Sequence, residues 1–361
     1  MGRLMIACGG TGGHLFPGLA VAEAVRRRGH DVKFLISAKE VDRRALSGAG
    51  ESDHGIEIPA VGWQGFFRAG SFLLNLFSAV KRAGEEMKSF RADALLGMGG
   101  FISAASVGAA RRRKIPYFLH ESNAIPGRTT KLFSKGARKV FVGFKDCAAR
   151  LPGSQTLVTG TPVRKRLGGL TKEEALKKLG LHPKRHLVAV LGGSQGARGL
   201  NDAMIRGLGA LKNDAATMQI LHLAGQTHAE KVKKAYQGSG FHAVVMGFCD
   251  EMEAVYAAAD LVVARSGAGT LAELSACGVP AILVPFPAAV DDHQTANAQA
   301  YAEEGAAEVV AEKYLFGTEL GQRIARLLGD SSRRSNMIKA AKKQSVVQAA
   351  EKIAEEIEHV F

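Results

Sequence analysis

The chain has 361 residues, a length that favours two domains because single hydrophobic cores rarely grow beyond about 250 to 300 residues. With 46% hydrophobic and 23% charged residues, the composition excludes a disordered or collagen-like chain. The best apolar stretch, 276–290, is short and contains three prolines, so we expect no membrane-spanning helix.

The formal net charge of +14 is distributed unevenly. Residues 1–150 contain 24 Lys and Arg against 12 Asp and Glu, whereas the rest of the chain is almost balanced. A one-sided basic surface attracts the phosphates of nucleic acid, anionic lipid or a phosphorylated substrate. The four cysteines lie far apart and the N-terminus lacks the apolar region of a secretory signal, so we expect a cytosolic protein.

The first elements predict a βαβ unit. A strand over 3–8 leads into the glycine loop 9–13, and a helix over 16–28 and a strand over 32–37 follow. Further strands are expected at 94–96, 116–119 and 139–142. This order requires a parallel sheet with right-handed crossovers, continuing to about residue 160.

Residues 63–82 form an aromatic segment that holds the only Trp and four of the 17 Phe. A buried helix explains such a run, and so does a surface patch that enters the headgroup region of a bilayer. The candidates for membrane contact are Trp63, Phe67, Phe72, Leu73, Phe77, Lys81 and Arg82. The basic run 111–114 is a solvated helix end or a further attraction for anionic lipid.

After a plausible hinge at 161–169, the second half repeats the arrangement. A helix over 171–179 has a capping box of Thr171 and Glu174, and a strand over 186–191 leads into the glycine loop 192–196. A helix is expected over 198–211, strands at 219–223, 243–246, 261–264 and 281–284, and a helical tail over 332–361. The two glycine loops share glycines at positions one, two and five, which predicts two similar open α/β domains.

Each glycine loop joins a strand to a helix, where backbone N–H groups can hold phosphate. The alternative is a tight turn that serves packing alone. The dinucleotide fingerprint fails because Leu15 stands at its sixth position, and the chain has no G-K-[S/T], which excludes a P-loop.

His14 follows the first glycine loop at the start of a helix. A helix N-terminus disfavours the imidazolium, so a histidine there can accept a proton near pH 7. The alternative is a polar residue in a turn.

Two later segments carry polar side chains after strands. In 265–273, Glu273 is either the partner of Thr270 in a capping box or a carboxylate that binds a ribose diol. In 291–297, carboxylates, amides and an imidazole could form hydrogen bonds with the hydroxyls of a sugar. The alternative, which explains them almost as well, is that they are ordinary polar residues at the protein surface. The chain has no D-x-D, so we expect no metal on a substrate diphosphate and no cofactor.

Six segments together carry a resemblance: GGTGGHLFPGLAVAE at the start, HESNAIPG at 120–127, GTPVR at 160–164, GGSQGARGLN at 192–201, RSGAGTLAEL at 265–274 and DDHQTANA at 291–298. In order and spacing they resemble the bacterial undecaprenyldiphospho-muramoylpentapeptide β-N-acetylglucosaminyltransferases, which convert lipid I to lipid II. The resemblance implies the GT-B fold, two Rossmann-like open parallel-sheet domains facing across a cleft. We expect an N-terminal acceptor- and membrane-facing domain over 1–163, a UDP-sugar-binding domain over 164–344, and a C-terminal helix 345–361 that returns to the first.

The same resemblance implies which residues bind UDP-N-acetylglucosamine and the acceptor. The donor contacts would be Ser194 and Gln195 by the diphosphate, Arg164 near the nucleotide, Phe248 and the Cys249 backbone around uracil, Glu273 on the ribose, and Gln294 and Asn123 on the sugar. The acceptor would face Thr11, Gly12, Gly13 and His14. Ser122 stands where the family usually has Gln, so a contact there is not carried over.

The implied reaction is an inverting, metal-independent displacement, with His14 as base and Glu121 as a second candidate. The implied partners are UDP-N-acetylglucosamine, a polyprenyl-diphosphate-linked muramyl-pentapeptide and an anionic membrane surface, with no nucleic acid. The protein would lie peripherally on the cytoplasmic face of the plasma membrane. The alternatives are a GT-B transferase acting on diacylglycerol, a sugar-nucleotide epimerase and a non-catalytic nucleic-acid binder.

Overall fold

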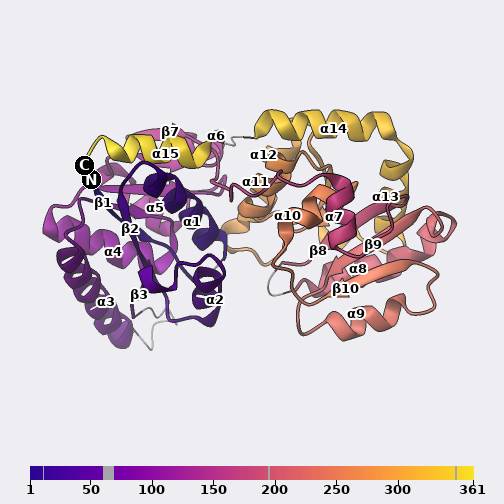
Figure 1. Cartoon of the computed structure of the whole chain (residues 1–361), viewed down its shortest axis with the longest axis horizontal. Coiled ribbons are helices and arrows are strands. Elements are labelled where there is room, and N and C mark those ends of the chain that lie inside the picture. Colours follow the sequence, from indigo (N-terminus) through magenta and orange to yellow (C-terminus); the bar gives the residue numbers. More distant parts are fainter. Residues whose placement is uncertain (11, 60–68, 194–195, 346–347) are drawn as a thin grey trace. The chain divides into compact units, whose positions relative to one another are not determined.

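The computed structural model describes residues 1–10, 12–59, 69–193, 196–345 and 348–361, with the side chains of 41 and 69–73 left out. The chain divides into two compact units (Figure 1). Unit 1 contains Met1–Arg164 and Val346–Phe361, and unit 2 contains Lys165–Ser345. Arg164, which we expected to begin the second domain, is therefore the last residue of the first stretch of unit 1.

Unit 1 is built on a parallel sheet whose described strands follow the order β3-β2-β1-β4-β5-β6-β7. The strands are β1 (Arg3–Ala7), β2 (Asp31–Ile36), β3 (Gly55–Glu57), β4 (Ala94–Gly97), β5 (Tyr117–Glu121), β6 (Val140–Val142) and β7 (Thr156–Val158). The helices are α1 (Gly12–Arg27), α2 (Glu40–Gly48), α3 (Ala69–Phe90), α4 (Gly100–Arg113), α5 (Arg128–Phe133), α6 (Lys145–Ala149) and α15 (Ala349–Glu358).

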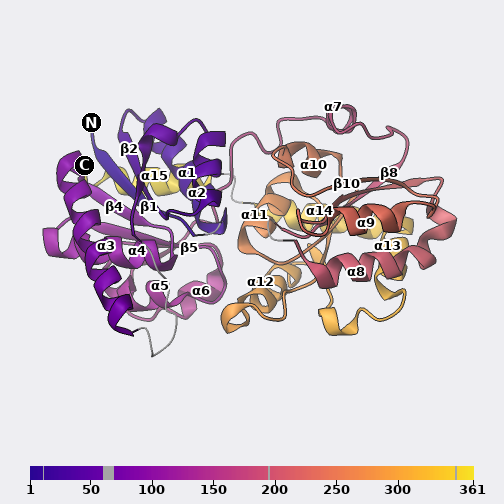
Figure 2. The ribbon, with the colours of Figure 1, turned by 90° about the horizontal axis from the view of Figure 1, so that it is seen from below.

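Helices cover both faces of this sheet, and the alternation of side chains along β1 shows how. Leu4 and Ile6 belong to the core shared with α1 and α15, whereas Met5 belongs to the core shared with α3 and α4. Figure 2 shows α3 and α4 side by side on the unit. A strand buried on both faces reads as a continuous apolar run, which is why β1 was readable from the sequence.

The C-terminal helix α15 packs on α1 within unit 1, and Figure 1 shows the two chain termini next to each other. Ile353 and Ile357 of α15 are buried. Glu358 accepts a hydrogen bond from His30 Nε2 (3.0 Å) and forms an ion pair with Arg28 (2.6 Å), and these partners lower the pKa of its carboxyl. The helical tail expected over 332–361 is therefore two helices, α14 (Ser331–Gln344) and α15, which belong to different units.

Unit 2 has a parallel sheet whose described strands follow the order β10-β9-β8-β11-β12-β13. The strands are β8 (His186–Leu191), β9 (Met218–Leu223), β10 (His242–Met246), β11 (Leu261–Ala264), β12 (Ala281–Leu283) and β13 (Ala307–Val309). The helices are α7 (Lys172–Lys178), α8 (Arg198–Gly207), α9 (Ala229–Tyr236), α10 (Met252–Ala258), α11 (Ala268–Cys277), α12 (His293–Ala302), α13 (Glu319–Gly329) and α14. Two open parallel-sheet units were predicted, and both are present.

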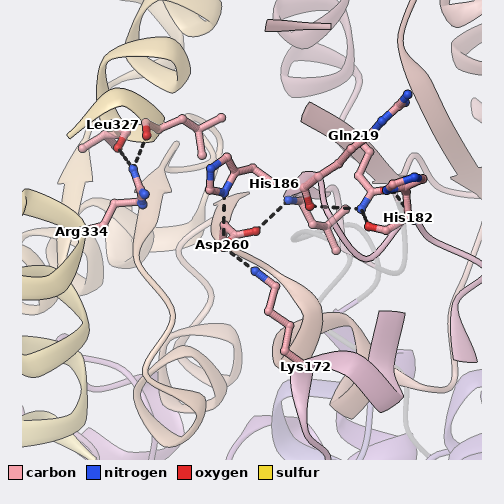
Figure 3. Close-up of polar contacts among 10 residues, drawn as sticks. Lys172, His182, His186, Gln219, Asp260, Leu327 and Arg334 are labelled. Carbon is pink, nitrogen blue, oxygen red and sulfur yellow. Dashed lines mark hydrogen bonds and ion pairs between the residues drawn. The ribbon is translucent and has the colours of Figure 1, made fainter. Parts of the chain in front are cut away.

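Polar contacts fix the amino edge of the unit 2 sheet (Figure 3). Asp260, just before β11, accepts a hydrogen bond from the Leu187 N–H of β8 (2.8 Å) and pairs with Lys172 of α7. Gln219 of β9 bonds both the N–H and the carbonyl oxygen of His182, each at 2.8 Å. The opposite, carboxyl edge of the sheet is where the loops of the candidate site begin.

Several element boundaries differ from those expected. The helix α1 begins at Gly12, one turn before the expected start at residue 16. The expected helix over 198–211 is α8 followed by a 3₁₀ segment, Leu208–Asp214. The capping box of Thr171 and Glu174 is confirmed. None of the described helices is both long and apolar enough to cross a bilayer.

Candidate functional site

The glycine loop after β1 is pinned at the carboxyl edge of the unit 1 sheet. Gly10 has φ +86°, a left-handed conformation that glycine adopts at little cost. Its N–H donates to Asp42 Oδ2 (2.7 Å), and Lys39 Nζ donates to its carbonyl oxygen (3.1 Å). Asp42 is fully buried and also accepts from the Ser37 hydroxyl. These contacts hold the loop directly before α1.

His14 lies in the first turn of α1, which also contains Gly12 and Gly13. Its Nδ1 lies 3.4 Å from the Gly9 carbonyl oxygen. The ring therefore lies at the N-terminus of α1, where the positive end of the helix dipole is. The neighbouring candidate Thr11 lies outside the described residues.

A glycine pair after β4 leaves the space in which the His14 ring lies. Our sequence analysis did not single out this pair. Gly99 and Gly100 have φ +108° and +72°. A Cβ at Gly99 would lie 2.9 Å from His14 Nε2, too close for any other residue without movement. The signal was available, because Met98-Gly99-Gly100 follows an apolar strand as the first glycine loop does.

His120 at the end of β5 is fully buried, and burial lowers its pKa to about 4. The positive charge of a protonated His14 lowers this pKa further, so the two imidazoles interact electrostatically. His120 Nε2 lies 3.3 Å from the Gly160 carbonyl oxygen, and Ser122 Oγ lies 3.4 Å from Nδ1. His120 is therefore neutral at pH 7 and links β5 to the segment that follows β7.

Glu121 organises the loop that follows β5. Its Oε1 accepts from the backbone and side-chain amides of Asn123 (3.2 and 3.0 Å), and its Oε2 accepts from the Gly127 N–H and the Thr130 hydroxyl (both 2.8 Å). A buried carboxylate has about four acceptor positions, and four donors already occupy those of Glu121, which leaves little room to bond a substrate hydroxyl. These bonds favour His14 over Glu121 as the base, and they fix Asn123.

Arg164 lies close to α1. Its guanidinium carbon lies 4.8 Å from the centre of the Phe16 ring, within the range of a cation–π contact. Its buried Nε has no hydrogen-bond partner among the described residues. Arg164 is thus oriented by stacking beside the helix that carries His14.

The second glycine loop follows β8 in unit 2. Gly192 N–H donates to the Leu223 carbonyl oxygen of β9 (3.0 Å), and Gly196 has φ +74°. A Cβ at Gly196 would lie 2.6 Å from the Ala224 carbonyl oxygen, so only glycine fits there. The loop leads to α8, which begins at Arg198. The predicted diphosphate contacts, Ser194 and Gln195, lie outside the described residues.

Glu273 lies in the second turn of α11 and does not cap that helix. The N-cap residue is Gly267, and no side chain caps it. The capping box of Thr270 and Glu273 weighed above is therefore wrong, because the helix begins three residues before that box requires. The carboxylate instead accepts a hydrogen bond from the Tyr256 hydroxyl of α10 (2.8 Å). Its charge also contributes, after burial, to raising the pKa of Cys277 to about 12.

Phe248 and Cys249 follow β10 at the same carboxyl edge of the sheet. Phe248 is 50% exposed, so its ring is open to stacking on a ligand. Cys249 is half-buried, and burial raises the pKa of its thiol. The thiol therefore stays neutral at pH 7, and only the backbone of Cys249 offers strong hydrogen-bonding groups.

Gln294 is held in place at the start of α12. Its Oε1 accepts from the Phe286 N–H (2.9 Å), and its carbonyl oxygen accepts from the Ser266 hydroxyl (2.7 Å). Arg265 donates to the carbonyl oxygens of Val284 and Pro285 at the end of β12 (3.2 and 3.1 Å). With Oε1 engaged, the Gln294 amide has its N–H₂ group to offer a sugar.

The described part of the aromatic segment lies on α3. Leu74 and Phe77 are 74% and 61% exposed, so the buried-helix interpretation is wrong for these two residues. The guanidinium carbon of Arg112 on α4 lies 5.9 Å from the centre of the Phe77 ring, and Lys81 and Arg82 are exposed. Trp63 and Phe67 lie outside the described residues, and the side chains of Phe72 and Leu73 are not described.

The predicted residues thus fall into two sets. His14, Asn123 and Arg164 lie in unit 1, each at a loop or helix start beyond the carboxyl ends of the strands. Phe248, Cys249, Glu273 and Gln294 occupy the corresponding edge of unit 2. Among the residues that the structure describes, no three or more His, Cys, Asp or Glu side chains form a group that could hold a metal ion.

Two family models match the chain. The glycosyltransferase family 28 N-terminal domain matches residues 4–142, and the glycosyltransferase family 28 C-terminal domain matches residues 187–353. The UDP-N-acetylglucosamine–N-acetylmuramyl-(pentapeptide) pyrophosphoryl-undecaprenol N-acetylglucosamine transferase of Geobacter sulfurreducens is 38% identical, and the alignment covers 98% of both chains.

Solved structures agree with these matches. The crystal structure of MurG from Acinetobacter baumannii superposes with a TM-score of 0.78 and 28% identity, covering 99% of both chains. A UDP-GlcNAc 2-epimerase from Neisseria meningitidis superposes with a TM-score of 0.70, but at 14% identity it shows only a shared fold. The GT-B fold class expected from the sequence is confirmed.

The sequence resemblance is confirmed by relatives that match almost the whole chain rather than isolated motifs. Both domain models lie on the expected halves, and the glycine loops, His14 and Glu273 fall inside the matched regions. The chain therefore belongs to glycosyltransferase family 28, among the UDP-N-acetylglucosamine–N-acetylmuramyl-(pentapeptide) pyrophosphoryl-undecaprenol N-acetylglucosamine transferases.

Proposed function

We propose that the chain transfers N-acetylglucosamine from UDP-N-acetylglucosamine to the 4-hydroxyl of the muramyl residue of lipid I, forming lipid II. The substrates are those in the name of its 38% identical relative. The donor is an α-linked diphosphate and the product is β-linked, so one in-line displacement inverts the anomeric carbon. The observation that supports the mechanism is the position of His14, which lies in the first turn of α1 next to Gly99 and Gly100.

His14 accepts the proton of the muramyl hydroxyl as that oxygen attacks the sugar. Its Nδ1 faces the Gly9 carbonyl oxygen, which favours a proton on Nδ1 and leaves Nε2 as the basic nitrogen. A base positioned in this way typically contributes 10² to 10⁴ to the rate. Asn123, held by Glu121, contributes an amide to the sugar.

Unit 2 binds the UDP part of the donor. Phe248 stacks on the uracil, the Cys249 backbone bonds its edge, and Glu273 accepts bonds from the ribose diol. Ser194, Gln195 and the N-terminus of α8 receive the diphosphate, with Arg164 supplying a cation. These N–H groups and cations stabilise the departing UDP, so the reaction needs no metal.

Unit 1 faces the acceptor and docks on the membrane peripherally, from the cytoplasmic side. An undecaprenyl acceptor keeps its chain in the bilayer, so the enzyme must approach the membrane surface. Leu74 and Phe77 supply exposed apolar surface on α3, and the run 111–114 at the end of α4 supplies positive charge nearby. Apolar insertion and attraction to anionic lipid together give reversible binding.

The test incubates the protein with UDP-N-acetylglucosamine and lipid I and identifies the product by mass. We expect lipid I to gain one N-acetylhexosamine as one UDP is released, with the rate unchanged in EDTA. Transfer of N-acetylglucosamine to diacylglycerol instead of lipid I would show that diacylglycerol is the acceptor. UDP release without any lipid would indicate the epimerase chemistry of the structural neighbours, and inactivation by EDTA that magnesium reverses would overturn the metal-independent mechanism.

A further inference from the structure

A buried tyrosine contacts the carboxylate that we place on the donor ribose. Tyr256 of α10 is only 2% exposed, and its hydroxyl donates a 2.8 Å hydrogen bond to Glu273 Oε2 on the neighbouring helix α11. Glu273 itself is half-buried and can be reached by a ligand. The Tyr256 hydroxyl therefore links the core of unit 2 to a half-buried carboxylate.

This bond has a physical consequence for ligand binding. A glutamate side chain has three rotatable bonds and loses conformational entropy when a ligand fixes it. A carboxylate has about four acceptor positions, and the Tyr256 hydroxyl uses one of them while restricting the rotamer. Glu273 is not used as a cap of α11, so its carboxylate can serve a ligand. The bond from the buried Tyr256 hydroxyl restricts the orientation of that carboxylate.

We propose that Tyr256 is a positioning residue that holds Glu273 in the orientation that accepts the two ribose hydroxyls of UDP. The proposal rests on the proposed function, in which Glu273 binds the ribose. Tyr256 does not touch the ligand and acts only through the carboxylate. Its effect must then depend on the ribose hydroxyls and on Glu273, which a purely structural effect would not.

The experiment measures the Kd of UDP and of 2′,3′-dideoxy-UDP for the intact chain by calorimetry. Tyr256→Phe removes one hydroxyl and keeps the ring. We expect the Kd of UDP to rise about tenfold, the size expected for a hydrogen bond to a charged acceptor, while the Kd of the dideoxy ligand stays unchanged. The donor KM should rise in parallel and kcat should stay close to that of the unmodified chain.

Tyr236→Phe is the matched control, because it removes another buried tyrosine hydroxyl from unit 2, one that contacts His222 Nδ1 (3.0 Å) and none of the donor-site side chains among the residues that the structure describes. It should leave the affinity for UDP unchanged. In a Glu273→Gln background, Tyr256→Phe should have little further effect on UDP binding. If Tyr256→Phe does not fold, Tyr256→Met provides the same loss of the hydroxyl.

The outcomes separate this inference from the proposed function. If Glu273→Gln weakens UDP binding and folded Tyr256→Phe does not, the positioning role is wrong and the ribose assignment of Glu273 stands. If Tyr256→Phe weakens both ligands equally, its effect is structural and the inference fails. If neither substitution changes UDP binding, Glu273 does not bind the ribose and both proposals fail at this residue.

Discussion

The guanidinium of Arg164 stacks on the ring of Phe16, with 4.8 Å between the guanidinium carbon and the ring centre. Phe16 lies two residues after His14 on α1, so the contact joins the helix of the proposed base to the residue that we place near the nucleotide. A planar guanidinium stacks on a ring and binds phosphate with two parallel bonds, whereas an ammonium offers neither geometry. The stacking therefore orients the guanidinium N–H groups of Arg164.

We predict that Arg164→Lys raises the donor KM although it keeps the charge. Phe16→Leu removes the stacking and keeps an apolar side chain against the core of unit 1, and it should raise the same KM about two- to fivefold, which corresponds to a cation–π contact of about 0.5 to 1 kcal/mol. Steady-state kinetics with varied UDP-N-acetylglucosamine measure both. An unchanged donor KM in folded Arg164→Ala would remove this residue from the donor site.

Two threonines test the assignment of helix caps in unit 2. Thr171 caps α7 through a complete capping box, so Thr171→Ala should lower the free energy of unfolding by about 0.5 to 2 kcal/mol. Thr270→Ala should lower it by much less, because α11 begins at Ala268 and Thr270 is no cap. Urea denaturation compares the two variants. Equal losses would mean that Thr270 stabilises its helix as a cap does.

The exposed apolar surface of α3 predicts membrane binding that salt weakens but does not abolish. Basic residues contribute about 1 kcal/mol each near an anionic surface and are screened by salt, whereas apolar insertion is not. The double change Leu74→Ser, Phe77→Ser should reduce binding to anionic vesicles in high salt without unfolding the chain. Sedimentation with vesicles measures it.

The control for this prediction is Phe316→Ser in unit 2, which removes an aromatic side chain that is 74% exposed and lies far along the chain from α3. It should leave vesicle binding intact. Parent-like binding by the folded double variant in high salt would place the docking surface elsewhere.

Two buried histidines predict that stability falls in mild acid. Burial lowers the pKa of His120 to about 4 and that of His222 to about 3, both below the ordinary value of 6.5. The unfolded chain then binds more protons than the folded chain below pH 6.5, so the free energy of unfolding decreases as the pH falls. The limit is about 1.4 kcal/mol per pH unit for each histidine.

Chemical denaturation between pH 6.5 and 5.5 measures this slope in a range where most carboxylates stay ionised. His222→Gln should reduce the slope, because it removes one of the two buried imidazoles. His186→Gln is the control, since its ring is about half exposed at the amino edge of the same sheet. A slope that His222→Gln leaves unchanged would show that His222 is not the titrating group.

The fold was predictable where the sequence has strong local signals. Strands such as β1 and β8 are buried on both faces and therefore appear as continuous apolar runs between glycines. The strands β3, β7 and β13 lie at the edges of their sheets and are only partly buried, so no continuous apolar run marks them in the sequence. The start of α1 was placed too late because Gly12 and Gly13 were assigned to the glycine loop, whereas the structure includes them in the first turn of α1.

The candidate site was predictable as residue types and not as contacts. The glycine loop and His14 follow each other in sequence, so their proximity was readable. The contact of His14 with Gly99 and Gly100 exists because β1 and β4 are neighbours in the sheet. The order of the strands is a property of the folded sheet and could not be read from these residues. The bond between Tyr256 and Glu273 joins two helices, and the spacing of Thr270 and Glu273 concealed it by imitating a capping box.

The most direct test of the account is the effect of His14→Ala on turnover and on UDP binding, measured on the same protein preparation. We predict that kcat with lipid I falls by about 10² to 10⁴ and that the Kd of UDP stays unchanged, because His14 acts on the acceptor hydroxyl. The low-pH decrease of kcat in the parent, which reports protonation of the base, should disappear in the residual activity. Normal turnover with weakened UDP binding would contradict the account and assign His14 to the donor.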